Sequence, residues 1–271
     1  MEELRPMDSK RVVVVTGGGS GIGRATALHF ASAGDTVVVA DINEEAGTAV
    51  VKGIVDAEGT AFFEYVDVAN DNSITELVKR VRSRCGAPSV LVNSAGLLQN
   101  PARLVDIDME EHDKIWSVNY RGTFMCCRQF VPGMIEMGEG AIVNISSTSA
   151  VRVFPLLAYS PSKSAIDQLT KILSADLGPN GIRVNAVLPG YVRSEQMQLR
   201  IDQGFRDESK MKDQSALGRM VEPLEIAEGI YFLCSSAAKA ITGTILPIDA
   251  GYLSSTSYQL YAGWTNDSVD R

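Results

Sequence analysis

The chain has 271 residues, 45% of them hydrophobic, which is enough to bury the core of a single domain with helices on both faces of one sheet. Its formal net charge of −8 argues against a surface that tracks nucleic-acid phosphates, because such a surface is basic. No segment approaches the roughly 20 uninterrupted apolar residues of a membrane helix. With two histidines and no CxxC pair, the sequence also predicts no metal site.

Cysteine usage and the amino-terminal residues bear on location. The four cysteines lack the spacing of a metal or redox motif, which favours free thiols in a reducing compartment. Residues 1–10 are charged and contain no apolar run, as in a short flexible leader and unlike a secretory signal. We therefore expect a cytoplasmic protein that associates with neither nucleic acid nor membrane.

Apolar strands and amphipathic helices alternate along the rest of the chain. The first strand, at residues 11–16, is β-branched and does not alternate, as expected for a parallel strand buried on both faces. Further strands are predicted at residues 36–40, 60–66, 90–93, 140–146, 183–188 and 244–248, and helices at residues 21–33, 73–84, 109–137, 158–177 and 223–234. The predicted fold class is therefore α/β, a single-domain, doubly wound parallel sheet of Rossmann type over residues 11–251.

Two segments fall outside this alternation. Residues 190–218 are polar, show a helical period around residues 197–201 and follow the end of the sixth strand, where ligands bind in such sheets. We predict that they form a lid. Residues 252–271 form a carboxyl-terminal tail containing Tyr252, Tyr258, Tyr261 and Trp264, and these aromatic residues either dock on this or a neighbouring subunit or stay loosely ordered.

A glycine-rich turn, TGGGSGIG at residues 16–23, joins the first predicted strand to the first helix. Glycine lets the backbone approach a pyrophosphate, whose charge is met by amide N–H groups and by the positive end of the helix. The position of the turn between a buried strand and a helix predicts a dinucleotide site at Gly17, Gly21 and Gly23.

Asp41 ends the second predicted strand, about 20 residues beyond Gly21. A carboxylate there can accept hydrogen bonds from the adenosine ribose of NAD and would repel the additional phosphate of NADP. No arginine or lysine stands immediately beside Asp41 to reverse that preference. The sequence therefore predicts NAD as the cofactor.

The catalytic prediction rests on Tyr159 and Lys163, which are spaced i, i+4 near the start of a predicted helix and so project from one face. The Lys163 ammonium, together with the charge of an oxidised nicotinamide, would lower the pKa of Tyr159 below its ordinary value of about 10. A phenolate could then accept an alcohol proton, and a phenol could donate one in the reverse direction. Ser146 or Ser147 could bond the substrate oxygen, and Asn119 could hold a water linking Lys163 to solvent.

Together, TGGGSGIGRA, Asp41, the NSAG run at residues 93–96, VNYRG, NISS, YSPSK and LPGYV resemble the short-chain dehydrogenase/reductase family over about residues 11–251. The resemblance implies a one-domain Rossmann-type sheet assembled as a homotetramer or homodimer. Tyr159 would be the acid/base, Lys163 its activator and a ligand of the nicotinamide ribose, and Asn119 a relay residue. The implied cofactor contacts are Ser20 and Ile22 at the pyrophosphate, Asp67 and Val68 at the adenine, Asn93, Ala95 and Gly96 along the cofactor, and Pro189, Gly190, Val192 and Ser194 at the nicotinamide.

Two departures from the family pattern matter. The loop before Tyr159 is slightly short, so spacing selects Ser146 as the substrate serine whereas strand register selects Ser147; we prefer Ser147, because a deletion is easier to place in a loop. Pro161 lies between Tyr159 and Lys163, which is acceptable only in the first turn of a helix.

These features predict an NAD-dependent oxidoreductase acting on a secondary alcohol that is cyclic, a polyol or sugar-like. A carbonyl or 3-oxoacyl reductase with the same catalytic set is the alternative, and a non-catalytic nucleotide-binding protein is a third. The small-molecule substrate would lie against residues 97–100 and 191–201 and against Ser149, Val151 and Val153. Six polar residues either favour a polyhydroxylated or anionic substrate or are merely solvated: Gln99, Asn100, Arg152, Arg193, Glu195 and Gln196.

Overall fold

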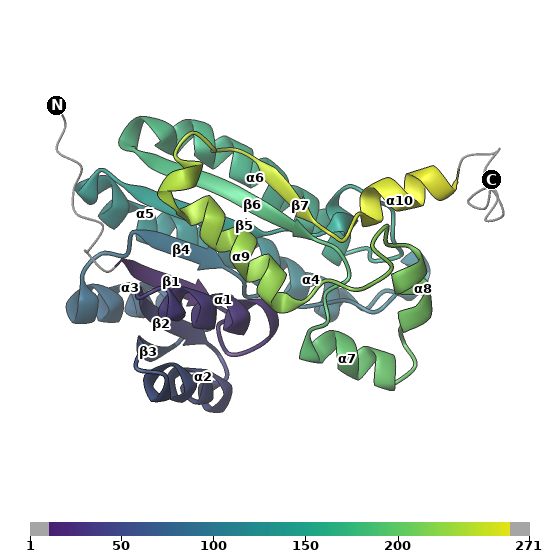
Figure 1. The fold of residues 1–271 in the computed structure, drawn as a ribbon, viewed down its shortest axis with the longest axis horizontal. Coiled ribbons are helices and arrows are strands. Elements are labelled where there is room, and N and C mark those ends of the chain that lie inside the picture. The colour runs from purple at the N-terminus through teal and green to yellow at the C-terminus, as the bar shows by residue number, and fades with distance from the viewer. Residues whose placement is uncertain (1–10, 261–271) are drawn as a thin grey trace.

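The computed structural model describes residues 11–260, so the predicted leader at residues 1–10 and residues 261–271 of the predicted tail lie outside the described part. Seven parallel strands form one sheet in the order β3-β2-β1-β4-β5-β6-β7 (Figure 1). The strands are β1 (Val12–Thr16), β2 (Thr36–Asp41), β3 (Thr60–Tyr65), β4 (Val90–Asn93), β5 (Gly140–Ile145), β6 (Ile182–Pro189) and β7 (Ile245–Ile248). The predicted doubly wound parallel sheet is confirmed.

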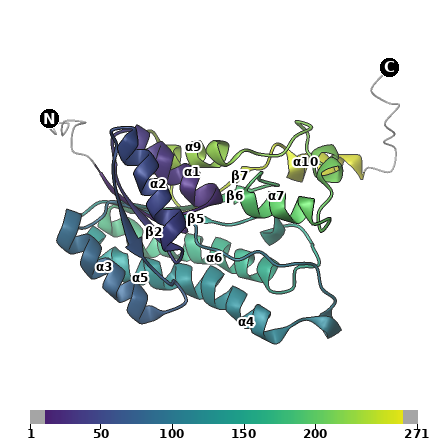
Figure 2. The same cartoon turned by 90° about the horizontal axis from the view of Figure 1, so that it is seen from below.

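Helices cover both faces of the sheet, as Figure 2 shows. One face carries α1 (Gly21–Ser32), α2 (Glu44–Asp56) and α9 (Pro223–Cys234), and the other carries α3 (Asp71–Cys85), α4 (Met109–Trp116), α5 (Thr123–Met137) and α6 (Tyr159–Leu177). Valines 13 to 15 of β1 are fully buried, because each strand residue faces one helical layer or the other. None of the helices within residues 11–260 is long and apolar enough to cross a membrane.

The predicted helix at residues 109–137 is interrupted. A π-helical turn, Ser117–Gly122, separates α4 from α5 and contains the buried Asn119. An extra residue per turn rotates the side chains that follow, and π-turns occur often at functional sites. The sequence on both sides of this turn is helical in pattern, so the sequence alone predicts one continuous helix at residues 109–137.

The segments outside the sheet contain three further helices. The predicted lid at residues 190–218 includes α7 (Glu195–Asp202), where a helical period is visible in the sequence, and α8 (Glu208–Asp213), which the sequence did not reveal. The tail begins with α10 (Tyr252–Gln259). Tyr252 is buried, with its ring centroid 5.3 Å from that of Tyr191 and 6.2 Å from that of Phe154, so it docks on its own subunit.

The order of the strands determines which edge of the sheet can bind a ligand. From β1 the chain builds outward to β2 and β3, then returns to place β4 on the other side of β1. Loops after β1 and β4 therefore leave the sheet in opposite directions and open a crevice at the carboxyl ends of these strands. The glycine-rich turn, Asp41 and the NSAG run all lie at this edge.

Candidate active site

A cleft of about 600 Å³ runs along the carboxyl edge of the sheet. It brings together most of the residues predicted to bind the cofactor. Those that line it are Gly17, Ser20, Gly21, Ile22, Asp41, Asp67, Val68, Ala95, Gly96, Tyr159, Lys163 and Ser194. Residues far apart in the sequence thus line one cleft at the carboxyl edge of the sheet, where ligands bind in folds of this kind.

Glycine is required in the turn for packing as well as for ligand access. Gly17 has a φ of 65°, and a Cβ there would lie 2.7 Å from the Ala95 Cα. A Cβ on Gly23 would overlap the Gly17 carbonyl oxygen. Gly23 therefore does not line the cleft; it supports the turn from behind, as the third glycine of this kind of turn does through close helix–strand packing.

Asp41 is held in the cleft wall by main-chain groups. Its two carboxylate oxygens accept hydrogen bonds from the N–H groups of Gly19 and Asn43, each at 2.8 Å. These bonds connect the end of β2 to the phosphate turn and leave the carboxylate beside the cleft. The residue is thus placed where an adenosine ribose would meet it.

Asn93 is placed differently from its predicted neighbours. Its side chain is buried, donates to Asn144 Oδ1 at 2.9 Å and lies 3.3 Å from Cys127 Sγ. It therefore joins β4 to β5 beneath the cleft rather than lining it. Pro189, Gly190 and Val192 line an adjoining pocket.

Tyr159 and Lys163 lie one turn apart at the start of α6, as predicted. Pro161 falls in the first turn of that helix, where no N–H partner is lost. The Lys163 Nζ donates to the Ile145 carbonyl oxygen at 2.7 Å and lies 5.6 Å from the centroid of the Tyr159 ring. Gln99 accepts hydrogen bonds from the N–H groups of Ala158 and Tyr159, at 3.0 and 3.1 Å, and so anchors the start of the helix.

Burial is the largest influence on the pKa values of Tyr159 and Lys163. It raises the pKa of Tyr159 above the ordinary value, and a hydrogen bond with Ser147 opposes that increase. It lowers the pKa of Lys163 to about 8, partly offset by Asp167. In the protein alone the pKa of Tyr159 is therefore raised by burial and not lowered as expected beside Lys163 and an oxidised nicotinamide; the Lys163 Nζ is bonded to the Ile145 carbonyl oxygen.

These directions predict a pH dependence. A base must be deprotonated to accept a proton, so a raised pKa of Tyr159 places alcohol oxidation on the alkaline side, whereas ketone reduction uses the phenol. Across roughly pH 7 to 9 the phenol stays mostly protonated, so we expect kcat/KM for oxidation to increase and kcat/KM for reduction to stay nearly constant. Initial rates in both directions across this range provide the check, and parallel profiles in the two directions would contradict the assignment.

Asn119 faces the same region from the π-turn. Its Oδ1 accepts from the Leu97 N–H at 2.8 Å, and its Nδ2 donates to the Leu97 carbonyl oxygen at 3.1 Å. A Cβ on Gly96 would make ordinary van der Waals contacts with Asn119 Oδ1, at 3.5 Å, and with Lys163 Nζ, at 3.7 Å, so Gly96 lies beside both groups.

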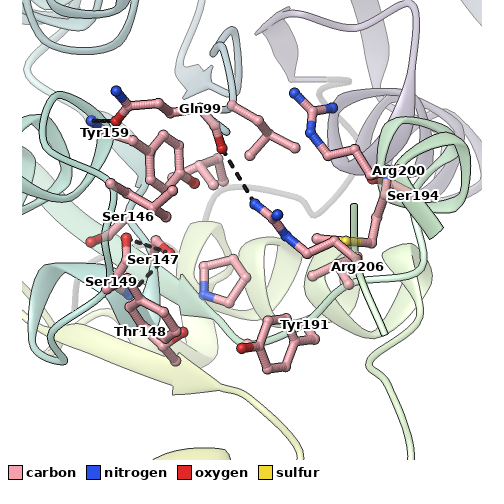
Figure 3. A pocket seen from close by; sticks show the side chains of 18 of the residues that line it. Gln99, Ser146, Ser147, Thr148, Ser149, Tyr159, Tyr191, Ser194, Arg200 and Arg206 are labelled. Carbon is pink, nitrogen blue, oxygen red and sulfur yellow. Dashed lines mark hydrogen bonds between the residues drawn. The ribbon is translucent and has the colours of Figure 1, made fainter. Parts of the chain in front are cut away.

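A second pocket, of about 330 Å³, adjoins the cleft, and Tyr159 lines both (Figure 3). Ser146 and Ser147 also line it. Ser147 interacts with the Tyr159 phenol and with the Ser149 hydroxyl, at 3.0 Å from the latter, whereas the buried Ser146 interacts with the Asp167 carboxyl group. The geometry thus favours Ser147 as the serine that acts beside the tyrosine.

The other polar residues expected near the substrate have separate positions. Only Gln99 lines the second pocket. Glu195 and Gln196 line the larger cleft, Arg193 forms ion pairs with Glu208 and Glu222, Arg152 donates to Ser257, and Asn100 is exposed. Val151 and Val153 are exposed as well, whereas Ser149 lines the pocket.

Glu195 of α7 reaches the amino-terminal end of α1. Its carboxylate accepts from the Gly21 N–H at 3.0 Å and pairs with Arg24. This N–H group at a positive helix end therefore already binds an anionic oxygen, so the site fits the pyrophosphate of a dinucleotide.

A pyrophosphate at this helix end would have to displace the Glu195 carboxylate, which predicts competition. Replacing Glu195 with Gln should lower the Kd for the dinucleotide about two- to fivefold, the effect of one charge at an exposed helix end. Calorimetric titration of both proteins measures the difference. The exposed Glu228→Gln substitution on α9 is the control, and an unchanged or higher Kd in Glu195→Gln would contradict the competition.

Comparison with protein families and curated relatives bears on this site. Residues 17–253 match a family model described as enoyl-(acyl carrier protein) reductase. The chain is 37% identical over 246 residues to 2,5-dichloro-2,5-cyclohexadiene-1,4-diol dehydrogenase of Sphingobium indicum, covering 90% of this chain and 97% of the relative. It is 35% identical over 245 residues to cis-4-hydroxycyclohexanecarboxylate dehydrogenase of Sinomonas cyclohexanicum, with the same coverage.

Solved structures share the fold over nearly the whole chain. A Brucella melitensis protein described as ribose-5-phosphate isomerase has a TM-score of 0.90 and 39% identity, covering 95% of this chain and 98% of that one. ElxO with NADP bound has a TM-score of 0.85 and 32% identity, covering 91% and 100%. A short-chain type dehydrogenase/reductase from Mycobacterium marinum has a TM-score of 0.85 and 29% identity, covering 90% and 96%. With its parallel sheet, glycine-rich turn and Tyr159–Lys163 pair, the chain belongs to the short-chain dehydrogenase/reductase family of oxidoreductases.

Proposed function

We propose that this protein is an NAD-dependent dehydrogenase that oxidises a secondary alcohol carried on a small ring. The observation that carries the proposal is the position of Tyr159, which lines both the dinucleotide cleft and the smaller pocket. From this position Tyr159 can exchange a proton with a substrate in the smaller pocket, while the hydride of that substrate moves toward a dinucleotide in the cleft. The cyclic alcohols named in the two curated relatives support a ring-borne hydroxyl.

Each residue of the site has its own role in the proposed reaction. Ser147 holds the substrate oxygen by a hydrogen bond, and the Tyr159 oxygen takes the hydroxyl proton during oxidation or returns it during reduction. The Lys163 ammonium holds positive charge near the phenol and would bind the nicotinamide ribose. The Asn119 side chain forms two hydrogen bonds with the main chain of Leu97 and so stabilises the loop that lies beside the Lys163 side chain. The nicotinamide, when bound, supplies the hydride acceptor.

Asp41 supports NAD rather than NADP. Its carboxylate lines the cleft, and the two basic residues nearest to it in sequence are already paired, Arg24 with Glu195 and Lys52 with Asp56. A 2′-phosphate would meet a negative charge there without a neutralising partner. ElxO, which shares this fold, has NADP bound, so a preference for NAD in this protein would come from the Asp41 side chain and not from the fold.

Formation of reduced nicotinamide from a panel of secondary alcohols tests the proposal. We expect steady turnover of cyclic alcohols with NAD, slower turnover with NADP, and no turnover of primary alcohols of the same size. A reductive physiological role, as in a carbonyl or 3-oxoacyl reductase, would instead give a higher kcat/KM for ketones with NADPH. Cytoplasmic location and assembly as a homotetramer or homodimer remain predictions, which fractionation and mass measurement in solution would test.

A further inference from the structure

The smaller pocket combines apolar walls with two arginines. Its apolar side chains come from loops on several sides: Leu98, Pro101, Phe154, Pro155, Leu156, Tyr191 and Met197. Arg200 of α7 and Arg206, in the turn before α8, also line it, and Figure 3 shows both on the side opposite Ser147. Among residues 11–260, no aspartate or glutamate lines this pocket.

Arg206 has no carboxylate partner among residues 11–260. Its guanidinium donates to two main-chain carbonyl oxygens, that of Phe205 at 2.9 Å and that of Gln99 at 3.3 Å. Burial lowers the pKa of Arg206, and the positive charge of Arg200 lowers it further. Two like charges kept close together at a half-buried site are unfavourable unless an anion joins them.

Arg200 also has a guanidinium that is only partly hydrogen-bonded within the described residues. Its Nε is buried and has no hydrogen-bond partner within the described residues, and one terminal nitrogen makes a long contact of 3.4 Å with the Gln196 carbonyl oxygen. Arg193, also on the lid, is paired with two glutamates outside the pocket. The contrast indicates that Arg200 and Arg206 are free to bind a ligand, whereas Arg193 serves the structure of the lid.

We propose that the substrate is a hydroxy acid: a monocyclic secondary alcohol whose carboxylate is bound by Arg206 and Arg200. The inference rests on the proposed dehydrogenase function and specifies its substrate. The hydroxyl lies at Ser147 and Tyr159, the ring packs against the apolar walls, and the carboxylate accepts charge-assisted hydrogen bonds from the guanidinium groups. A phosphorylated polyol fits less well, because Leu98, Phe154, Leu156 and Met197 offer no partners for several hydroxyl groups.

A hydroxycyclohexanecarboxylate and its methyl ester are suitable probes, because they differ in charge and share the reacting alcohol. We expect the wild-type protein to favour the acid over the ester by about 10- to 100-fold in kcat/KM, the effect of one or two charge-assisted bonds. Arg206→Gln should remove that preference, mainly through KM, by lowering kcat/KM for the acid much more than for the ester. Arg206→Lys should restore part of it, and Arg200→Gln should reduce it.

Two further measurements make the outcome decisive. Arg152→Gln, on a loop outside the pocket, is the matched control and should keep the full preference for the acid. Calorimetric titration with cyclohexanecarboxylate in the presence of NADH reports binding without turnover, and should show binding to the wild type that Arg206→Gln loses. Equal kcat/KM for acid and ester in the wild type, or an equal loss for both in Arg206→Gln, would overturn the proposal.

The two proposals fail in different ways. Oxidation of cyclic alcohols without preference for the acid would leave the dehydrogenase function intact and refute the carboxylate site. Absence of turnover with every alcohol, combined with binding of cyclohexanecarboxylate that depends on Arg206, would refute the proposed reaction and support the anion site.

Discussion

Replacing Tyr159 with Phe should lower kcat/KM for alcohol oxidation by roughly 10²- to 10⁴-fold, the range that a positioned acid/base contributes. The substitution removes one oxygen and keeps the ring against Lys163, so the fold and the dinucleotide cleft should be preserved. We therefore expect the Kd for NADH, measured by calorimetry, to change less than threefold (about 0.6 kcal/mol). Initial rates with saturating NAD provide the activity.

Tyr231→Phe is the matched control for this experiment. Tyr231 on α9 contacts His29 and Phe30 on the helical layer, with ring centroids 5.0 and 5.1 Å away, and lines neither site. Its variant should retain wild-type turnover. Near-normal activity in Tyr159→Phe would remove the tyrosine from the mechanism, whereas loss of NADH binding in that variant would show a structural role instead.

Replacing Asp41 with Asn should shift cofactor preference toward NADP by about 10- to 100-fold. Two negative charges about 5 Å apart in a partly exposed cleft repel by roughly 1–3 kcal/mol, and Asn removes the charge on the protein side. Asn keeps an oxygen that can accept from the Gly19 or Asn43 N–H, so the phosphate turn retains part of its anchoring. The ratio of kcat/KM for NAD to that for NADP measures the shift.

Asp56→Asn separates a local effect from a change in net charge. Asp56 pairs with Lys52 on the exposed surface of α2 and lies outside the cleft. Its variant should keep the wild-type cofactor ratio. If Asp41→Asn also keeps that ratio, the carboxylate does not select the cofactor, and the preference for NAD must come from another part of the cleft.

Local sequence determined the fold and the chemistry of the cofactor edge. Buried parallel strands are recognisable because both faces must be apolar, as in β1 with its run of valines. In the glycine-rich turn and in the Tyr159–Lys163 pair, the residues that act together are only a few positions apart along the chain. Their spacing in the sequence therefore predicts how they lie relative to one another. These predictions needed no knowledge of long-range contacts.

The tertiary structure decided the features that depend on contacts between distant segments. Gln99 anchors the start of α6, Glu195 reaches the end of α1, and Arg206 enters the substrate pocket from the lid. None of these residues belongs to a local motif, and Arg193 of the lid and Arg219 just after it form ion pairs instead. A charged side chain has the same local signature whether it faces solvent, an acid or a ligand; only the packing of the elements around it decides which.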